Sequence, residues 1–453
     1  MRYLYTTAFC IALLAISCNE TQDTEVEEVN SLSAANLTSE ENALLDRVQK
    51  ETYDYFWTGG EPISGAARER IHMDSIYPSN DADIVTAGGT GFGIMGTIAA
   101  IERDFITREE GYERLRKLTD FLTTADRFYG AWPHWFHPDG STKPFSRNDD
   151  GGDLVETAFI AQGLIAAREY FKDGSLSERV LARDMDKLWR EIDWSWYTKG
   201  ENVLYWHWSP KYEWEKDFDV RGYNECLIMY ILAASSPTHP VSKAVYEEGF
   251  MRGGKVVTDR IYYGLPTIFD HYETNDKAVG PLFWAHYSYL GLDPRGLKDQ
   301  FGDFWEMNRN HALIHYRHAV ENPYDYAGYS DECWGMTSSY SMLGYAGHSP
   351  QLDLGVISPT AALSSFPYTP AESMKFLKYM YDSQDSLIGA YGPYDAFSIQ
   401  SRWYLPRYLA IDQLPIPVMI ENYRSGLLWN LFMSAPEVQE GLDKLGFTYN
   451  KPE

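Results

Sequence analysis

The chain has 453 residues, enough for two or three ordinary domains or for one large barrel or toroid. Its formal net charge of −26 argues against nucleic acid and anionic membrane surfaces as partners, so a neutral ligand fits better. Aromatic residues make up 15% of the chain, with 34 Tyr and 14 Trp, and such side chains suit surfaces that stack on sugar rings or peptides.

The N-terminus has the pattern of an export signal. A basic start leads into the apolar run 4–16, which is too short to span a membrane as a helix. Small residues before Cys18 resemble a bacterial lipobox, so we expect a lipoprotein signal peptide at 1–17 and lipid anchoring through Cys18 in the bacterial periplasm or outer membrane. The alternative is an ordinary signal peptide that contains a Cys. The acidic segment 18–39 is predicted to be a flexible tether before a single domain, 40–453.

Helical patterns dominate the predicted domain. Apolar residues recur at helical spacing, and Thr107 with Glu110 has the form of a capping box. The amphipathic helices are predicted over 43–57, 109–125, 176–192, 242–251, 295–318 and 371–383. Segments that are apolar on every side, as buried helices are, begin near 90, 153, 223, 281, 357 and 414. Six buried helices paired with outer ones predict an all-α (α/α)6 toroid. We read the glycines of 88–93 as close packing or turns, because no strand precedes them and no Lys follows.

Long aromatic loops precede several of the predicted inner helices. They span 129–137, 206–209, 324–329 and 392–397. In a toroid these loops reach the same end, so we expect them to form the walls of a cleft. Sugar contacts are predicted for Trp132, His134, Trp208 and Tyr394.

Three carboxylates, Asp149, Asp153 and Glu156, stand just before the second buried segment at spacing i, i+4, i+7. Two interpretations stay open. Asp153 and Glu156 have the form of an N-cap with an acidic N3 residue. Carboxylates clustered at the rim of a core also shift one another's pKa, as active sites require. The cap alone does not explain Asp149 and Asp150.

Glu225 stands at the start of the third buried segment, beside Leu227 and Ile228. Glycoside hydrolysis needs two carboxyl groups in different environments, one protonated and one ionised. Apolar surroundings would raise the pKa of Glu225, as a general acid requires. A helix dipole would lower it instead, and the residues alone leave both outcomes open.

Four motifs in order resemble the bacterial glycoamylase-like proteins, which include the β-1,2-glucanases of glycoside hydrolase family 144. They read NDDGGDLVETA at 148–158, RGYNE at 221–225, GAYGPYDAF at 389–397 and IENYRSGL at 420–427. The resemblance covers about Leu44 to the C-terminus. It implies an (α/α)6 fold and inverting hydrolysis of β-1,2-glucan, endo-acting or releasing sophorose from a chain end, with no metal or other cofactor.

Carried over by position, the resemblance implies that Glu225 is the general acid and that Asn224 adjoins it at the sugar. The family's acidic cluster corresponds to Asp149, Asp153 and Glu156, which are expected to bind substrate. Asp412 is the first choice for the base and Asp395 the second, at a wide distance from the acid. Many members read Asp-Gln-Gly-Pro where this chain has DQLP at 412–415, and this departure from the family pattern leaves the local backbone and the subsite shape open.

Two alternatives remain beside this reading. The fold could hydrolyse another glucan, or the chain could be a non-catalytic, glycan-binding surface lipoprotein. The paired carboxylates argue against the second alternative, because binding needs aromatic and amide groups more than acids. The expected partner is a neutral β-glucan or gluco-oligosaccharide, and the membrane is reached only through Cys18.

Overall fold

The computed structural model describes residues 33–272 and 279–451. The predicted signal peptide and Cys18 lie outside the described residues. The first helix begins at Ser39, one residue before the predicted domain start, and the boundary between tether and domain stays a prediction. Across the described ranges, no helix combines the length and apolar character that crossing a membrane requires.

Helices are the dominant regular structure of the described residues. The α-helices are α1 (Ser39–Trp57), α2 (Ala87–Glu102), α3 (Arg108–Thr124), α4 (Leu154–Phe171), α5 (Leu176–Arg190), α6 (Leu227–Ser235), α7 (Phe304–Glu321), α8 (Pro359–Leu363), α9 (Pro370–Ser383), α10 (Ala410–Gln413), α11 (Pro415–Arg424), α12 (Leu427–Met433) and α13 (Pro436–Leu445). Three of them start with the predicted kind of cap: Thr38, Thr107 and Ser175 each form a capping box with a Glu at N3.

The strands are short and all pair antiparallel. The pairs are β1 (Arg70–His72) with β15 (Arg407–Leu409), β2 (Val85–Thr86) with β3 (Trp135–Phe136), β3 with β4 (Thr142–Lys143), β5 (Gly152–Asp153) with β6 (His207–Trp208), β7 (Ile261–Tyr262) with β8 (Leu265–Pro266), β9 (Ser338–Ser339) with β10 (Ala346–Gly347), β11 (Ile388–Gly389) with β12 (Gly392–Pro393), and β13 (Phe397–Ser398) with β14 (Trp403–Tyr404). These short sheets of two or three strands connect neighbouring loops and do not form a continuous sheet layer.

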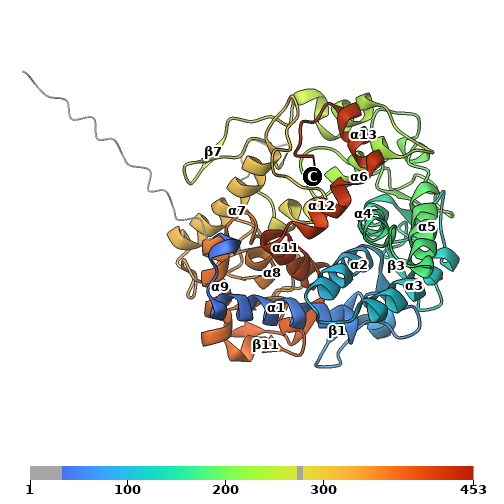
Figure 1. The fold of residues 1–453 in the computed structure, drawn as a ribbon. Coiled ribbons are helices and arrows are strands. Elements are labelled where there is room, and N and C mark those ends of the chain that lie inside the picture. The colour runs from blue at the N-terminus through green and yellow to red at the C-terminus, as the bar shows by residue number, and fades with distance from the viewer. Residues whose placement is uncertain (1–32, 273–278, 452–453) are drawn as a thin grey trace, which may run out of the picture. The chain divides into compact units, whose positions relative to one another are not determined.

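The inner helices form a closed ring, which confirms the predicted toroid. Helix α2 packs against α4, α4 against α6, and α6 against the turn η7 (Tyr287–Tyr289). Helix α11 contacts both α8 and α2, so the end of the chain closes the ring against its beginning (Figure 1). Outer helices cover this ring: α5 packs on α4, α13 on α6 and α9 on α8.

Three predicted helices differ from the structure. The inner helix expected near 281 is replaced by two 3-10 turns, η6 (Leu282–Ala285) and η7. This segment is rich in aromatic residues, which lose rotamer freedom in an α-helix. The helix expected over 295–318 begins only at Phe304, because Asp303 caps it and glycines precede it. The segment expected over 242–251 contains a π-helix at Val245–Phe250.

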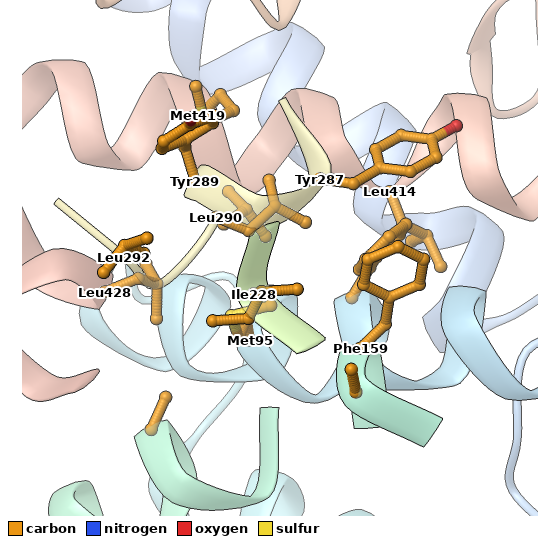
Figure 2. Packing of buried hydrophobic residues seen from close by; sticks show 14 of the residues in the cluster. Met95, Phe159, Ile228, Tyr287, Tyr289, Leu290, Leu292, Leu414, Met419 and Leu428 are labelled. Carbon is orange, nitrogen blue, oxygen red and sulfur yellow. The ribbon is translucent and has the colours of Figure 1, made fainter. Parts of the chain in front are cut away.

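Glycines allow α2 and α4 to approach closely. A Cβ at Gly91 would lie 2.2 Å from the carbonyl oxygen of Phe159, and one at Gly163 would lie 2.5 Å from the carbonyl oxygen of Gly91. The predicted close packing of the 88–93 glycines is therefore confirmed. The centre of the ring is filled by large apolar side chains from helices far apart in the sequence (Figure 2). Those labelled are Met95, Phe159, Ile228, Tyr287, Tyr289, Leu290, Leu292, Leu414, Met419 and Leu428.

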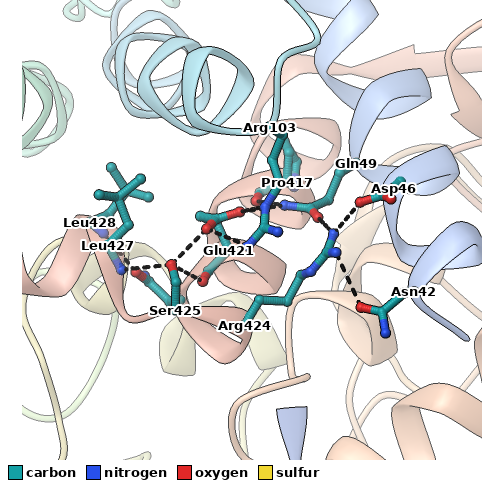
Figure 3. A network of polar contacts seen from close by, with 11 residues as sticks. Asn42, Asp46, Gln49, Arg103, Pro417, Glu421, Arg424, Ser425, Leu427 and Leu428 are labelled. Atoms are coloured by element: carbon teal, nitrogen blue, oxygen red, sulfur yellow. Dashed lines mark hydrogen bonds and ion pairs between the residues drawn. The ribbon is translucent and has the colours of Figure 1, made fainter. Parts of the chain in front are cut away.

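A buried ionic network holds the two ends of the chain together (Figure 3). Glu421 of α11 is 2% exposed and accepts two hydrogen bonds from Arg103, at 2.6 and 2.8 Å. Gln49 of α1 donates to Glu421, and Arg424 donates to Gln49 and to Asp46. The motif at 420–427 thus contributes to ring closure, because it links α1, the end of α2 and α11.

Candidate active site

A cavity of about 410 Å³ opens among the starts of the inner helices and the loops before them. Three carboxyl side chains line it: Glu69, Glu156 and Glu225. The other lining residues are Arg70, Thr86, His134, Trp135, Phe145, Val155, Phe159, Trp206, Phe283, Tyr287, Tyr340, Tyr345, Leu409 and Ile411. Acidic groups against largely aromatic walls suit a neutral polyhydroxylated ligand.

Asp153 is both a helix cap and a member of the site. Its Oδ1 accepts from the backbone N–H of Glu156 at 2.9 Å, so it caps α4 as one interpretation of the sequence predicted. Its Oδ2 accepts from Trp206 Nε1 at 2.9 Å and lies 2.8 Å from His134 Nδ1. Asp153 itself is fully buried, and it acts on the cavity by orienting the two side chains that line it.

Asp153 and Glu156 do not form a capping box, although they have the form of an N-cap with an acidic N3 residue. Glu156 turns into the cavity and accepts from the backbone N–H of Gly88 at 2.7 Å. A Cβ at Gly88 would lie 2.4 Å from Oε2 of Glu156, so only glycine allows this approach. The start of α2 therefore positions a carboxyl of α4.

The charges at this end of the cavity are interdependent. Burial opposes protonation of His134, but the neighbouring carboxylates of Glu156 and Asp153 raise its pKa to about 9. Burial also opposes ionisation of Asp153, yet the hydrogen bonds and charge of His134 hold its pKa below the ordinary value. Burial, with the charge of Asp153, raises the pKa of Glu156 to about 7. One ion pair, His134 with Asp153, therefore stands beside a carboxyl that retains its proton easily.

Asp149 stands behind the cavity wall. It is 3% exposed, ion-paired with Lys216, and its Oδ1 lies 3.2 Å from His207 Nε2. Asp149, Asp153 and His134 do offer ligand atoms within 4.8 Å of one another, the spacing of a possible metal site. The oxygens of Asp153 already accept hydrogen bonds from three donors, and Asp149 is already paired with the ammonium group of Lys216. Both carboxylates of the possible metal site therefore have protein partners.

Glu225 enters the cavity from the turn before α6. Its exposed fraction is 9%, and burial raises its pKa to about 7, with smaller contributions from the charges of Glu156 and Asp153. Desolvation therefore outweighs the helix-start effect that the sequence had left open. Asn224 does not line the cavity; its Oδ1 accepts from the N–H of Cys226 at 2.9 Å and so holds the turn that presents Glu225.

Asp395 and Asp412 form a buried acid pair next to the cavity wall made by Leu409 and Ile411. Burial raises the pKa of Asp395 to about 6. Burial and the adjoining Asp395 raise the pKa of Asp412 well above its ordinary value. Tyr340 N–H donates to Asp395 at 2.8 Å. The hydrogen bond between the two carboxyls lowers the pKa of Asp395 and raises that of Asp412, so Asp412 carries the proton and donates it to Asp395. Such a pair holds one proton between two carboxyls.

Glu69 is a site residue that sequence reasoning missed. It lines the cavity with an exposed side-chain fraction of 14%, ion-paired with Arg70, and burial raises its pKa. Its negative charge in turn raises the pKa of Asp395 and Asp412. The antiparallel pairing of β1 with β15, which sets Arg70 opposite Leu409, brings Glu69 beside the acid pair. No local signal marks it, because the contact joins segments about 340 residues apart.

The predicted aromatic contacts divide into two groups. His134 lines the cavity, with its ring stacked on Phe145 at 4.3 Å. Trp132 is fully buried and donates to a carbonyl of α3, so it packs in the core. Trp208 packs against Tyr129, and Tyr394 stacks on Tyr404; neither lines the cavity.

Two of the four predicted loops reach the cavity, those at 129–137 and 206–209. The other walls come from segments that were not singled out. Tyr340 and Tyr345 belong to the hairpin of β9 and β10, and Phe283 and Tyr287 belong to the 3-10 turns. Aromatic density alone therefore did not identify which loops face the cavity.

Comparison with known proteins gives a consistent set of relatives. The family model described as "Glycoamylase: Putative glucoamylase" matches residues 217–436. A curated protein of Parabacteroides distasonis, "Exo beta-1,2-glucooligosaccharide sophorohydrolase (non-reducing end)", is 41% identical over 94% of this chain. The chain spans 60% of that relative's length.

Similar solved structures include β-1,2-glucanases. An endo-β-1,2-glucanase from Chitinophaga pinensis, in complex with sophorotriose and glucose, is 53% identical, with 91% of this chain and 99% of that chain covered and a TM-score of 0.89. A Talaromyces funiculosus endo-β-1,2-glucanase bound to sophorose is 12% identical, covers 93% of this chain and 96% of its own, and has a TM-score of 0.60. The second match shows a shared fold alone.

Proposed function

Since the chain belongs to the glycoamylase-like family that includes the β-1,2-glucanases of glycoside hydrolase family 144, we propose that it hydrolyses β-1,2-glucan. The proposed mode is endo cleavage, because the endo-acting Chitinophaga relative is similar over nearly its whole length. The single observation that carries the proposal is Glu225, a carboxyl in the cavity wall with a pKa of about 7.

The proposed mechanism is inverting. Protonated Glu225 donates its proton to the glycosidic oxygen as the bond from that oxygen to the anomeric carbon breaks. A water attacks the anomeric carbon from the opposite face, and its proton passes to the acid pair of Asp412 and Asp395. Because the pair shares one proton, one carboxylate charge is available to accept another. Asp412 is the proposed base: it accepts the water's proton as the proton it shares passes to the Asp395 carboxylate. A separation of roughly 6.5–9.5 Å or more from Glu225 would leave room for the water.

The remaining residues of the site are proposed to bind sugar. Glu156 and His134 face the cavity. The protonated His134 ring supplies a hydrogen-bond donor to sugar hydroxyl groups, and the carboxyl oxygens of Glu156 supply an acceptor. Asp153 holds His134 and Trp206 in place. Asp149 is proposed to support this arrangement from behind through Lys216. The proposal requires no metal.

The test replaces Glu225 by Gln. We expect the fold and binding of sophoro-oligosaccharides to be kept, with turnover lower by roughly 10²-fold or more, the scale of lost general acid catalysis. Wild-type turnover should fall as the pH rises through about 7, because Glu225 then loses the proton that it donates. Near-normal turnover of Glu225→Gln, or a product that retains the anomeric configuration by NMR, would contradict the assignment.

Two comparisons complete the test. Asp412→Asn should lose more turnover than Asp395→Asn if Asp412 is the base, and equal losses would point to the pair as one unit. Wild-type enzyme is assayed on β-1,2-glucan, laminarin, a cellulose derivative and starch, and release of reducing sugar from another glucan alone would refute the linkage. A ladder of products indicates endo cleavage, whereas sophorose alone indicates release from a chain end.

We also propose that the protein is exported and anchored by lipid on Cys18 in the bacterial periplasm or outer membrane. The lipobox-like residues before Cys18 support this location. An extracytoplasmic β-glucan is then within reach of the cavity.

A further inference from the structure

A second hollow lies on the surface beside the turn that follows α5. Its volume is about 430 Å³, and Ser195, Trp196, Lys199, Gly200 and Trp214 line it. These residues are separate from the lining of the catalytic cavity and take no part in the proposed mechanism.

Aromatic rings form the walls of this hollow. Trp196 is 37% exposed and stacks on Tyr129, which is 43% exposed, with ring centres 3.8 Å apart and planes at 16°. Trp214 lies 6.3 Å from Trp196, and edge contacts with Tyr197 and Tyr205 hold it in place. The rings are thus fixed before any ligand arrives, which lowers the entropy lost on binding.

The backbone keeps the hollow open. Lys199 has a φ of +54° and Gly200 a φ of +81°, so two consecutive residues of its lining are left-handed. Left-handed geometry at a lysine is uncommon, and such strain is concentrated at functional sites. A Cβ built at Gly200 would meet no atom within 4 Å, as expected at an open edge.

The charge of the hollow is balanced. Lys199 Nζ donates to Asp217 at 2.6 Å and lies 4.1 Å from the ring centre of Tyr205. Its charge is therefore already paired, and the protein as a whole carries a net charge of −26. An anionic ligand is disfavoured, whereas a neutral ligand with apolar faces and many hydroxyl groups is suited to paired rings edged by polar side chains.

The hollow connects to the catalytic cavity through aromatic side chains. Tyr129 also packs against Trp208, with ring centres 5.1 Å apart. Trp208 follows Trp206 by two residues and lies in strand β6. Trp206 lines the catalytic cavity. A long ligand leaving the cavity at Trp206 would therefore find further rings on its path.

From these contacts we infer that Tyr129, Trp196 and Trp214 form a secondary binding site for a neutral glucan chain, outside the catalytic cavity. The inference rests on the proposed function, since it names the same polymer as ligand. The site holds parts of a long substrate that the cavity does not contain. Short oligosaccharides that fit within the cavity do not depend on it.

The experiment separates binding from cleavage. Glu225→Gln protein is run through native gels that contain β-1,2-glucan, laminarin, a soluble cellulose derivative or soluble starch. The same background carries Trp196→Ala, or Tyr129→Asn, where Asn tolerates the left-handed backbone. Tyr324→Ala removes another exposed ring, 58% exposed, as the matched control. Folding of each variant is verified by circular dichroism.

We expect retardation by β-1,2-glucan to weaken about tenfold in both site variants and to stay unchanged in Tyr324→Ala. In the active enzyme, Trp196→Ala should raise KM for the polymer while sophorotriose turnover stays at the wild-type value. Polymer binding by Trp196→Ala equal to that of the control overturns the inference, as does the absence of retardation by any glucan. Retardation by another neutral glucan, lost in Trp196→Ala, supports the site and instead refutes the β-1,2 linkage of the proposed function.

Discussion

Replacing Asp153 by Asn tests how the site and the fold depend on one carboxylate. Asp153 is fully buried and its two oxygens serve Glu156 N–H, Trp206 Nε1–H and His134 Nδ1–H. Asn has only one acceptor oxygen, so one side of the carboxylate is replaced by an NH2 group that faces a donor. The change keeps size and shape but removes the charge and at least one hydrogen bond.

The magnitude follows from these contacts. Asn is as good an N-cap as Asp, so its oxygen can keep the bond to Glu156 N–H while its NH2 group faces the donors of Trp206 and His134. Leaving a buried donor unpaired costs about 1–3 kcal/mol, so we expect the free energy of unfolding to fall by about 3 kcal/mol. That is a large share of the ~5–15 kcal/mol typical of a folded protein. The pKa of His134, now about 9, should fall, because one of the carboxylates that raise it has lost its charge.

Urea unfolding at pH 7 measures the stability change, and NMR titration of the His134 ring measures its pKa. Turnover per folded molecule should fall by about 10²-fold, because His134 and Trp206 lose their common anchor. Thr107→Ala, which removes a solvent-exposed cap of α3, is the matched control and should lose about 1 kcal/mol with normal turnover. If Asp153→Asn behaves like that control, Asp153 is only a cap and the reasoning fails.

Three further predictions concern packing, acid stability and anchoring. Gly88→Ala should displace Glu156 and reduce turnover, whereas Gly96→Ala on the same helix, with its nearest contact at 3.3 Å, should not; equal effects in activity assays would contradict this. Burial lowers the pKa of His286 to about 3 and of His311 to about 4, so below pH 6.5 the unfolded chain binds protons that the folded chain does not. Stability should then fall by about 1.4 kcal/mol per histidine per pH unit between pH 6.5 and 4, and urea midpoints that do not change with pH would refute it. Cys18→Ala should be released from membranes or left unprocessed in a bacterial host, and equal membrane partition of variant and wild type would refute lipid anchoring.

The toroid could be predicted from sequence because its signals are local. A segment that is apolar on every side must be buried, and a capping box marks a helix start within four residues. Thr107 with Glu110 and the cap at Asp153 are confirmed for this reason. The segment near 281 shows the limit: it is buried as predicted but forms 3-10 turns, because burial alone does not distinguish one helical backbone from another.

The site could be predicted where its chemistry lies at a helix start or, for His134, in an aromatic loop before one. Glu156 and Glu225 were found there and both line the cavity. Glu69 and Tyr340 were not found, because strand pairing and a hairpin bring them in from distant segments. Asp149 shares the helical spacing of its neighbours, yet it precedes the helix and pairs with Lys216 instead. Spacing predicts a common face only within a regular element.

The protonation states of the site carboxyls depend on how deeply each side chain is buried. The sequence does not show this burial, so it left those states open. Burial is the main cause that raises the pKa of Glu225 to about 7, and the charges of Glu156 and Asp153 add to it. Burial raises the pKa of Glu156 to the same value although His134 lies 4.0 Å away and lowers it, and the charge of Asp153 adds to the effect of burial. The positive charge of His134 is thus neutralised mainly by Asp153, with which it forms an ion pair. Glu225 is left as an acid that can donate near neutral pH, as the proposed reaction requires.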